Sequence, residues 1–311
     1  PVYPHGEFGR AKIPDQPSTV FVKGATVWTC GAQGKLENAD MIVQKGKIAT
    51  VGNNLQAPAD AVLIDGTGRH ITPGIIDAHS HTATAAVNEA AQAISAEVRI
   101  GDVIDCDDIS VYHQLAGGTT TIHVLHGSAN PIGGQSQILK LRWGMLPDEM
   151  KLEAAPPTIK FALGENVKQS NWGERFTTRY PQTRMGVEQI MRDEFTAALD
   201  YEKAWQRWEK DKSGIPPRRD LELDAVLEVI RGKRFVHCHS YRQDEILAMM
   251  RVAEDFGFRI QVFQQILEGY KVADVMAKHG AGASCFTDWW AYKLEVYDAI
   301  PYNGALMHNA G

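Results

Sequence analysis

The hydrophobic and polar positions of this chain change their spacing twice. Residues 1–19 carry four prolines among small and polar residues, without a sustained apolar period, which predicts an arm that crosses a surface. From Val20 onward, short runs rich in β-branched residues, such as Val20–Val22 and Met41–Gln44, are separated by single glycines. This spacing predicts a small antiparallel β domain over residues 20–73.

Beyond Pro73, apolar strand-like runs alternate with longer helical stretches, the pattern of a parallel sheet covered by helices. Seven strands are predicted at residues 74–79, 119–125, 137–141, 158–163, 234–239, 259–263 and 282–286. Helices are predicted at residues 104–116, 186–208, 220–231, 244–256 and 269–278. An eight-stranded α/β barrel typically needs about 250 residues, and slightly fewer remain in residues 74–311.

Composition and charge exclude several classes of function. The net charge of −6 leaves no basic field for a phosphate backbone, so nucleic acid is not expected as a partner. No apolar run approaches the roughly 20 residues of a membrane-spanning helix, so no membrane partner is expected either. The four cysteines are too scattered for a disulfide framework. A soluble protein is expected, and its first residue, proline, leaves both a cytoplasmic and a periplasmic location open.

The strongest chemical signal is the pair His79 and His81 at the end of the first predicted barrel strand. Side chains alternate along a strand, so two histidines separated by one residue point to the same face. In a parallel barrel, the carboxyl ends of the strands open onto the active-site face. Two imidazoles at this spacing make half of a metal site.

The run Thr72-Pro73-Gly74-Ile75-Ile76-Asp77-Ala78-His79-Ser80-His81 resembles the amidohydrolase superfamily of metal-dependent hydrolases. Segments 127–134, 162–166 and 301–304 are similar to its imidazolonepropionase-related branch. The resemblance implies an α/β fold, a TIM-like (β/α)8 barrel with a small β-sandwich built from both chain ends. It also implies one or two divalent metals, with zinc as the first candidate.

The resemblance assigns further ligands to the ends of later strands. His237 matches the ligand of the fifth strand, and His239, two residues further on the same face, is an alternative ligand or a substrate contact. Glu165, after the fourth strand, is the candidate for a carboxylate that bridges two metals. Many relatives use a carboxylated lysine on this strand. Lys160 is the only such lysine, but it lies five positions back and on the opposite face by parity, which favours Glu165.

The chain departs from the family pattern at two places. Gln265 stands where relatives carry a ligand histidine on the sixth strand, and an amide oxygen is a weak ligand that can instead hydrogen-bond outside the ligand set. One of two metals is therefore expected to bind weakly or to be lost. The catalytic aspartate of an eighth strand is absent, so no catalytic residue is assigned, and Asp288 is interpreted as a loop carboxylate.

The expected reaction is hydrolysis of a C–N bond in an amide, cyclic amide or dipeptide-like small molecule by a metal-activated water. Asn166, Tyr241 and Arg242 follow ligand-bearing strands and are candidate substrate contacts, since a guanidinium binds a carboxylate through two hydrogen bonds. Imidazolonepropionase itself is disfavoured, because its fifth strand continues into an Asp-Glu pair, whereas Cys238 and His239 follow His237 here.

The alternative is a truncated or divergent barrel without catalysis that acts as a binding or assembly component. A barrel without its eighth strand leaves two strand edges unpaired, and such edges pair readily with another chain. A homo-oligomer, or a partner segment that completes the barrel, is therefore expected. The metal content of the native chain distinguishes the two hypotheses.

Overall fold

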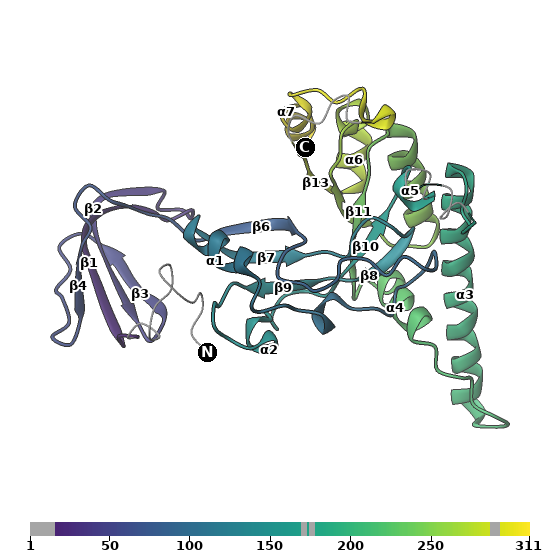
Figure 1. Cartoon of the computed structure of the whole chain (residues 1–311), viewed down its shortest axis with the longest axis horizontal. Coiled ribbons are helices and arrows are strands. Elements are labelled where there is room, and N and C mark those ends of the chain that lie inside the picture. Colours follow the sequence, from purple (N-terminus) through teal and green to yellow (C-terminus); the bar gives the residue numbers. More distant parts are fainter. Residues whose placement is uncertain (1–15, 169–172, 174–177, 287–292) are drawn as a thin grey trace. The chain divides into compact units, whose positions relative to one another are not determined.

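The computed structural model describes residues 16–168, 173, 178–286 and 293–311 (Figure 1). The chain divides into two compact units, residues 1–76 with 114–120, and residues 77–113 with 121–311. Most of the predicted arm, residues 1–15, lies outside the described residues, and so does Asp288. Within the described part, no helix is both long enough and apolar enough to cross a membrane.

The first unit is built on one β-sheet. Its strands are β1 (Thr19–Trp28), β2 (Lys35–Gln44), β3 (Lys47–Gly52), β4 (Val62–Asp65) and β5 (His70–Ile71). The order is β3-β2-β1-β4, with β5 also paired to β1. Lys45 and Gly46, both at positive φ, form the two-residue turn that an antiparallel hairpin favours.

The prediction of an antiparallel β domain is confirmed for β1, β2 and β3 and is wrong for β4 and β5, which run parallel to β1. The loop between β3 and β4 is long enough to carry the chain back to the edge of the sheet where β1 begins. Strand β4 can therefore run in the same direction as β1. The described residues of this unit form one layer, and the second layer of the predicted sandwich stays a prediction.

Two further sheets follow along the chain. The five-stranded sheet has the order β13-β12-β11-β10-β8, and the three-stranded sheet has the order β6-β7-β9. Their strands are β6 (Ile75–Ser80), β7 (Thr119–Val124), β8 (Ile132–Gln135), β9 (Gln137–Lys140), β10 (Thr158–Ala162), β11 (Phe235–His239), β12 (Ile260–Gln264) and β13 (Gly282–Ser284). All seven predicted barrel strands are present, and β8 is an additional one.

Strands β10 to β13 are parallel, as predicted. The prediction of a parallel sheet is wrong for β9, which is antiparallel to β7, and β8 is antiparallel to β10. A parallel return needs a crossover, usually a helix, and the short stretch between β7 and β9 holds only β8. The described strands therefore form separate sheets rather than one closed barrel.

Helices α3 and α5 pack against one face of the five-stranded sheet (Figure 1). The α-helices are α1 (Ile109–Ala116), α2 (Pro147–Met150), α3 (Arg184–Asp211), α4 (Leu221–Ile230), α5 (Gln243–Asp255), α6 (Ala273–His279) and α7 (Asn303–Ala310). Short 3-10 helices are η1 (Ile100–Asp102), η2 (Asn166–Lys168), η4 (Gly269–Lys271) and η5 (Leu294–Val296).

Strand alternation divides the side chains of this sheet into an apolar face and a polar face. Phe161 belongs to the buried core and packs against Phe195 of α3, with ring centroids 6.1 Å apart. The intervening positions carry polar groups, because Lys160 pairs in register with His237, and His239 with Gln264. The face opposite the helices therefore gathers the groups that can carry chemistry.

Candidate metal site

His79 and His81 approach each other at the end of β6. Their Nε2 atoms are 3.2 Å apart. Two imidazole nitrogens that bind one tetrahedral zinc ion at roughly 2.0–2.1 Å each lie about 3.3–3.4 Å apart. The spacing of this pair therefore fits a shared ion.

The other ring nitrogen of each histidine is held by an oxygen atom. His79 Nδ1 lies 2.8 Å from Gln264 Oε1, and His81 Nδ1 lies 2.9 Å from the carbonyl oxygen of Leu125. A carbonyl oxygen only accepts, so each Nδ1 carries the proton and each Nε2 keeps its lone pair. Burial, reinforced by the nearby amine of Lys160, lowers the pKa of His79 to about 2 and that of His81 to about 4. Both rings are therefore neutral at neutral pH, as metal ligands must be.

His239, at the end of β11, has the same arrangement. Its Nδ1 is bonded to Gln265 Oε1, and its side chain is 1% exposed. Its Nε2 is buried and has no hydrogen-bond partner among the described residues. Metal-binding histidines usually donate their second ring N–H to such an oxygen, so His239 is configured as a ligand.

His237 is configured differently. Its Nδ1 lies 3.0 Å from Gln264 Nε2, a donor, so this Nδ1 accepts and the proton of the neutral ring is on Nε2. The ring of His237 packs edge-on against His123, with centroids 4.6 Å apart. His123 in turn bonds Thr158 Oγ1 through its Nε2, at 2.8 Å. Of the two β11 histidines, His239 thus offers the free Nε2.

Lys160 lies among these histidines. It is 0% exposed, and its Nζ has no hydrogen-bond partner in the described part of the chain. Burial lowers the pKa of Lys160 to about 7, and its charge in turn depresses the pKa of His79, His81 and His239. An unpaired, fully buried amine is costly, and its proximity to these histidines makes it a candidate functional group.

The parity argument against Lys160 fails because the strand is shorter than predicted. β10 ends at Ala162, and Gly164 has a φ of 84°, so the alternation of faces does not extend to Glu165. Glu165 lies in the bend after the strand, where its backbone N–H donates to Glu295 Oε2 at 3.0 Å. Lys160 is therefore the residue that strand register places beside His237.

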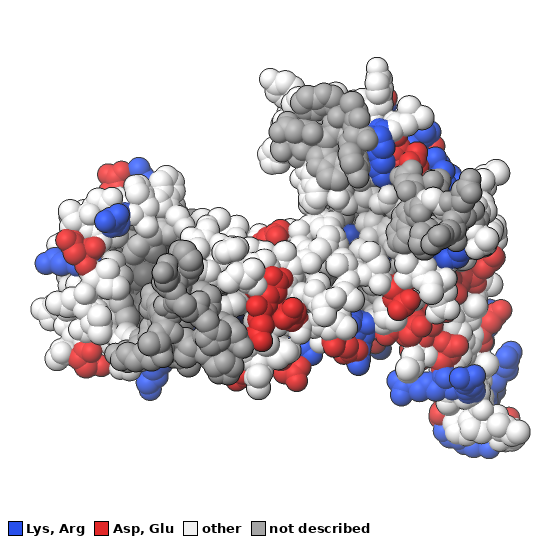
Figure 2. Space-filling view, in the orientation of Figure 1, with Lys and Arg blue, Asp and Glu red and all other residues white. Residues whose placement is uncertain are grey.

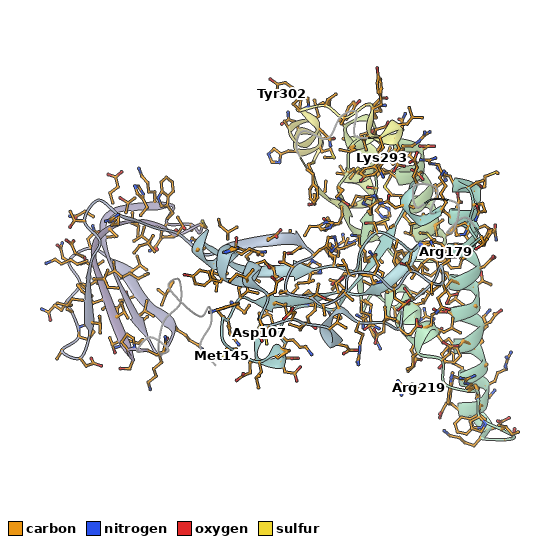
Figure 3. All side chains as sticks on the ribbon, viewed as in Figure 1. Asp107, Met145, Arg179, Arg219, Lys293 and Tyr302 are labelled. Atoms are coloured by element: carbon orange, nitrogen blue, oxygen red, sulfur yellow. The ribbon has the colours of Figure 1, made fainter. Side chains whose placement is uncertain are left out.

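Two buried carboxylates hold the bend after β10. Glu295 binds Arg184 at 2.8 Å and Lys293 at 2.7 Å, and Glu245 binds Arg184 at 3.0 Å and the backbone N–H of Gly164 at 2.9 Å. Lys293, labelled in Figure 3, also donates to Asn166 Oδ1 at 3.1 Å. Asn166 is thus fixed beside a cation that sequence reasoning missed.

The other two predicted substrate contacts, Tyr241 and Arg242, have different surroundings. Tyr241 is 2% exposed and packs against His239, with ring centroids 4.5 Å apart, and Lys293 Nζ lies 4.7 Å from its ring. Arg242 instead binds both carboxylate oxygens of Asp244, at 3.0 and 3.1 Å. Its guanidinium is therefore paired with a neighbour on its own chain segment, and its role as a substrate contact stays a prediction.

The donor set can be tested against a divalent ion. Among the described residues, no three side chains of His, Cys, Asp and Glu lie close enough together to hold a metal. The histidines supply neutral nitrogens, and the buried group beside them is an amine without a carboxylate. An amine that has reacted with CO2 becomes a carbamate with two ligand oxygens. A carbamate on Lys160 would supply the oxygen donors that the His79–His81 pair lacks.

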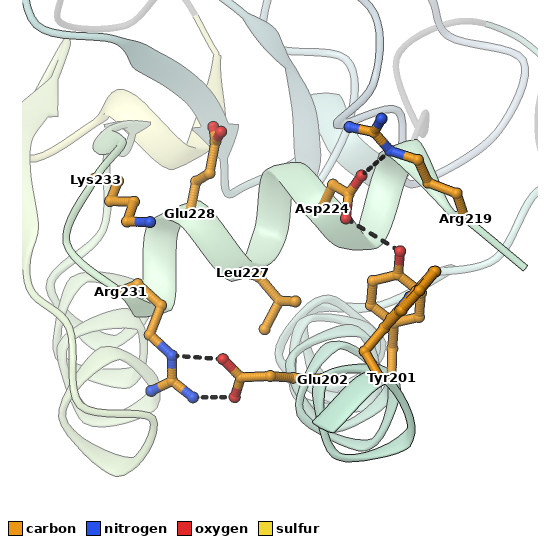
Figure 4. Close-up of a pocket in the computed structure, with 9 residues that line it drawn as sticks. Tyr201, Glu202, Arg219, Asp224, Leu227, Glu228, Arg231 and Lys233 are labelled. Carbon is orange, nitrogen blue, oxygen red and sulfur yellow. Dashed lines mark hydrogen bonds and ion pairs between the residues drawn. The ribbon is translucent and has the colours of Figure 1, made fainter. Parts of the chain in front are cut away.

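A pocket of about 530 Å³ lies between α3 and α4 (Figure 4). Arg231 binds both oxygens of Glu202. Arg219 Nε and Tyr201 Oη bind Asp224 at 2.9 and 3.1 Å. Figure 2 shows acidic and basic side chains interspersed along this part of the visible face. These charged groups of the pocket thus pair with one another, while Trp205 Nε1, also in the lining, has no hydrogen-bond partner among the described residues.

No family model matches the chain. Among solved structures, the chain is similar to an amidohydrolase from Thermotoga maritima MSB8, with 31% sequence identity and a TM-score of 0.85. The match covers 94% of this chain and 76% of that one. The chain belongs to the amidohydrolase superfamily, and this confirms the resemblance of its first motif.

Among curated proteins, the amidohydrolase tasK of Hapsidospora irregularis is 30% identical over 307 residues, covering 88% of this chain. The match covers 31% of that protein, so this chain spans about a third of its length. The imidazolonepropionase of Idiomarina loihiensis is 41% identical over 75 residues, which is 23% of this chain and 18% of that protein. Such a short match leaves the narrower branch a prediction.

Proposed function

We propose that the protein hydrolyses a C–N bond in an amide, cyclic amide or dipeptide-like substrate with the help of a divalent metal. The ion would be held by the pair His79 and His81, by a carbamate on Lys160 and by His239, which would have to move toward the pair, since no three described donors lie close enough together in this structure. The observation that carries the proposal is the His79–His81 pair, with Nε2 atoms 3.2 Å apart, together with two buried groups that have no hydrogen-bond partner among the described residues, Lys160 Nζ and His239 Nε2. This set replaces His237 and Glu165, the ligands expected from the sequence, with His239 and Lys160.

Lys160 can acquire the missing carboxylate because its amine is easily deprotonated. With a pKa near 7, a large fraction of the amine is neutral at neutral pH. The neutral nitrogen forms a bond to the carbon of CO2 and releases a proton to solvent. The product is an anion, so a cation among neutral histidines becomes a group that attracts a divalent ion.

The remaining residues would bind the substrate. When bound, a divalent ion supplies hydroxide from water near neutral pH and polarises the substrate carbonyl. Imidazole and carbamate donors are compatible with zinc, the first candidate, and with manganese, iron or cobalt. Asn166, fixed by Lys293, and Tyr241, packed on His239, would contact the substrate beside the reacting bond.

The test is a hydrolysis assay with metal analysis. The purified chain is loaded with zinc, manganese or cobalt at several bicarbonate concentrations and is assayed on N-acyl amino acids, dipeptides and cyclic ureides. We expect hydrolysis that increases with bicarbonate and disappears in Lys160→Met, while Lys168→Met, on η2, retains it. Metal-loaded protein that turns over no member of the panel would support the non-catalytic alternative.

We also propose that the protein assembles through its sheet edges. Strands β13 and β6 are terminal strands of their sheets among the described residues, and unpaired edges accept further strands. A homo-oligomer or a partner segment would cover them. Light scattering of the purified chain that shows a monomer at all concentrations would argue against self-association.

A further inference from the structure

We infer that Gln264 and Gln265 are positioning residues that determine which ring nitrogen of His79, His237 and His239 carries the proton, and that they thereby restrict the site to one metal ion. The inference rests on the proposed function, since it concerns the same site. It assigns a role to two consecutive amides that neither histidine ligation nor packing explains.

Gln264 joins two histidines with the two ends of one amide. Its Oε1 lies 2.8 Å from His79 Nδ1, and its Nε2 lies 3.0 Å from His237 Nδ1. The oxygen only accepts and the nitrogen only donates. One side chain therefore places the proton of His79 on Nδ1 and the proton of His237 on Nε2, which are opposite tautomers.

Gln265 acts on the third histidine through an unusual backbone conformation. Consecutive strand residues point to opposite faces, so an extended Gln265 would point away from its neighbour. Its φ is 54°, in the left-handed region, and its Oε1 binds His239 Nδ1. Non-glycine residues in this region are uncommon and concentrate at functional sites. The bend thus brings both amides to the histidines.

The consequence is a limit on the number of ions. His79 and His239 present bare Nε2 atoms, whereas the Nε2 of His237 carries hydrogen and its Nδ1 is bound to Gln264. A neutral imidazole in that state has no lone pair left for a metal. Gln265, expected from the sequence to be a weak ligand, therefore orients His239 instead, and Gln264 withholds His237 from a second ion.

The first experiment reads the tautomers directly, in metal-free protein labelled with ¹⁵N-histidine. Long-range ¹H–¹⁵N spectra separate protonated from bare ring nitrogens, with signals assigned by replacing each histidine in turn. We expect Nδ1–H for His79 and His239 and Nε2–H for His237. The reverse pattern in the wild-type protein would overturn the inference, and this result needs no variant to fold.

Substitutions distinguish the role of Gln264 from that of Gln265. Gln264→Met should change the tautomers of His79 and His237 and leave His239 alone, while Gln265→Met should change His239 alone. Gln261→Met is the matched control, because Gln261 lies on the same strand and contacts Arg259 rather than a histidine. Unchanged tautomers in both variants, or equal changes in the control, would contradict a positioning role.

The second experiment measures zinc binding by competition with a chromogenic chelator. Losing a hydrogen-bond partner behind a ligand histidine typically weakens metal affinity about 10–100-fold, which we expect for Gln264→Met and Gln265→Met but not for Gln261→Met. The wild-type protein should bind one ion per chain, and two tight ions would refute the limit. If the protein binds no zinc, the proposed function fails while the tautomers still decide the role of the glutamines.

Discussion

The histidine site and the α3–α4 pocket differ in how their charged groups are paired. The pocket is spacious, at about 530 Å³, and its acids are paired, as with Glu202 and Arg231. Beside the histidines, Lys160 Nζ and His239 Nε2 are buried without partners among the residues described, and so is Trp205 Nε1 in the pocket, but an indole N–H only donates and cannot bind a metal. Folded proteins satisfy nearly all buried polar groups, so the exceptions, more than the open volume, indicate function.

The two regions should also contribute differently to the free energy of unfolding. A solvent-exposed ion pair contributes about 0–1 kcal/mol to stability, so the pocket contributes little through each pair. A buried polar group without a partner costs about 1–3 kcal/mol. A protein that retains such groups carries a destabilising site, and a bound ion would remove the cost. Substitutions in the two regions should therefore have opposite consequences.

The largest effect is expected for Lys160→Met. Hydrolysis should fall to the background rate, since the proposed carbamate would be lost. The free energy of unfolding of the metal-free protein should rise by about 1–3 kcal/mol, because an unpaired amine is replaced by an apolar chain of similar size. Assays and urea denaturation measure both. A variant that is less stable, or still active, would show that the amine has a partner or a different role.

The two β11 histidines should differ next. His239→Ala should weaken zinc binding more than about 100-fold, the upper end for residues that only support a ligand, while His237→Ala should stay within that supporting range. Chelator competition on both variants measures the difference. Equal losses, or a larger loss for His237→Ala, would reinstate His237 as the ligand.

The ion network behind the site should be important for stability. Glu295→Gln leaves Arg184 and Lys293 without their shared carboxylate, and breaking a buried pair costs about 3–5 kcal/mol of unfolding free energy. Glu188→Gln, which removes one of the two carboxylate partners of Arg192 on α3, is the more exposed control and should cost at most about 1 kcal/mol. Comparable losses in urea denaturation would count against the network.

A smaller, pH-dependent effect is expected near α4. Burial, with Glu194 and Glu97 nearby, raises the pKa of Glu222 from its ordinary 4.5 to about 8. Because the folded pKa exceeds the unfolded one, this carboxyl's contribution to stability is present below pH 4.5 and is lost as the pH rises toward 8. Glu222→Gln should reduce the decline in unfolding free energy between pH 5 and 8.

Unfolding measured at both ends of this range tests the sign. Glu209→Gln, on the exposed part of α3, serves as the control and should leave the decline as it is in the wild-type protein. An unchanged pH dependence in Glu222→Gln would mean that its carboxyl is not the buried acid.

The smallest effect belongs to the α3–α4 pocket. Arg231→Met removes the partner of Glu202 and should lower the free energy of unfolding by at most about 1 kcal/mol, with hydrolysis unchanged. Denaturation and the hydrolysis assay check both values. A loss of activity would place function in this pocket and reverse the comparison.

Local sequence determined much of the protein. The changing apolar period located seven of the eight described strands beyond Pro73 and the longer helices between them, because burial of one face imposes its spacing on the chain. The His79 and His81 pair was evident because two residues on one strand face need no knowledge of other strands. The superfamily also followed from this short run, and the structural match confirmed it.

Only the tertiary structure decided which residues meet at the site. Whether Lys160 or Glu165 faces the histidines depends on where β10 ends, and the roles of Gln264 and Gln265 depend on a single backbone bend. The proton positions on His237 and His239 depend on amides from the neighbouring strand. Strand register and bends are set by packing across the whole sheet, so they cannot be read from local sequence.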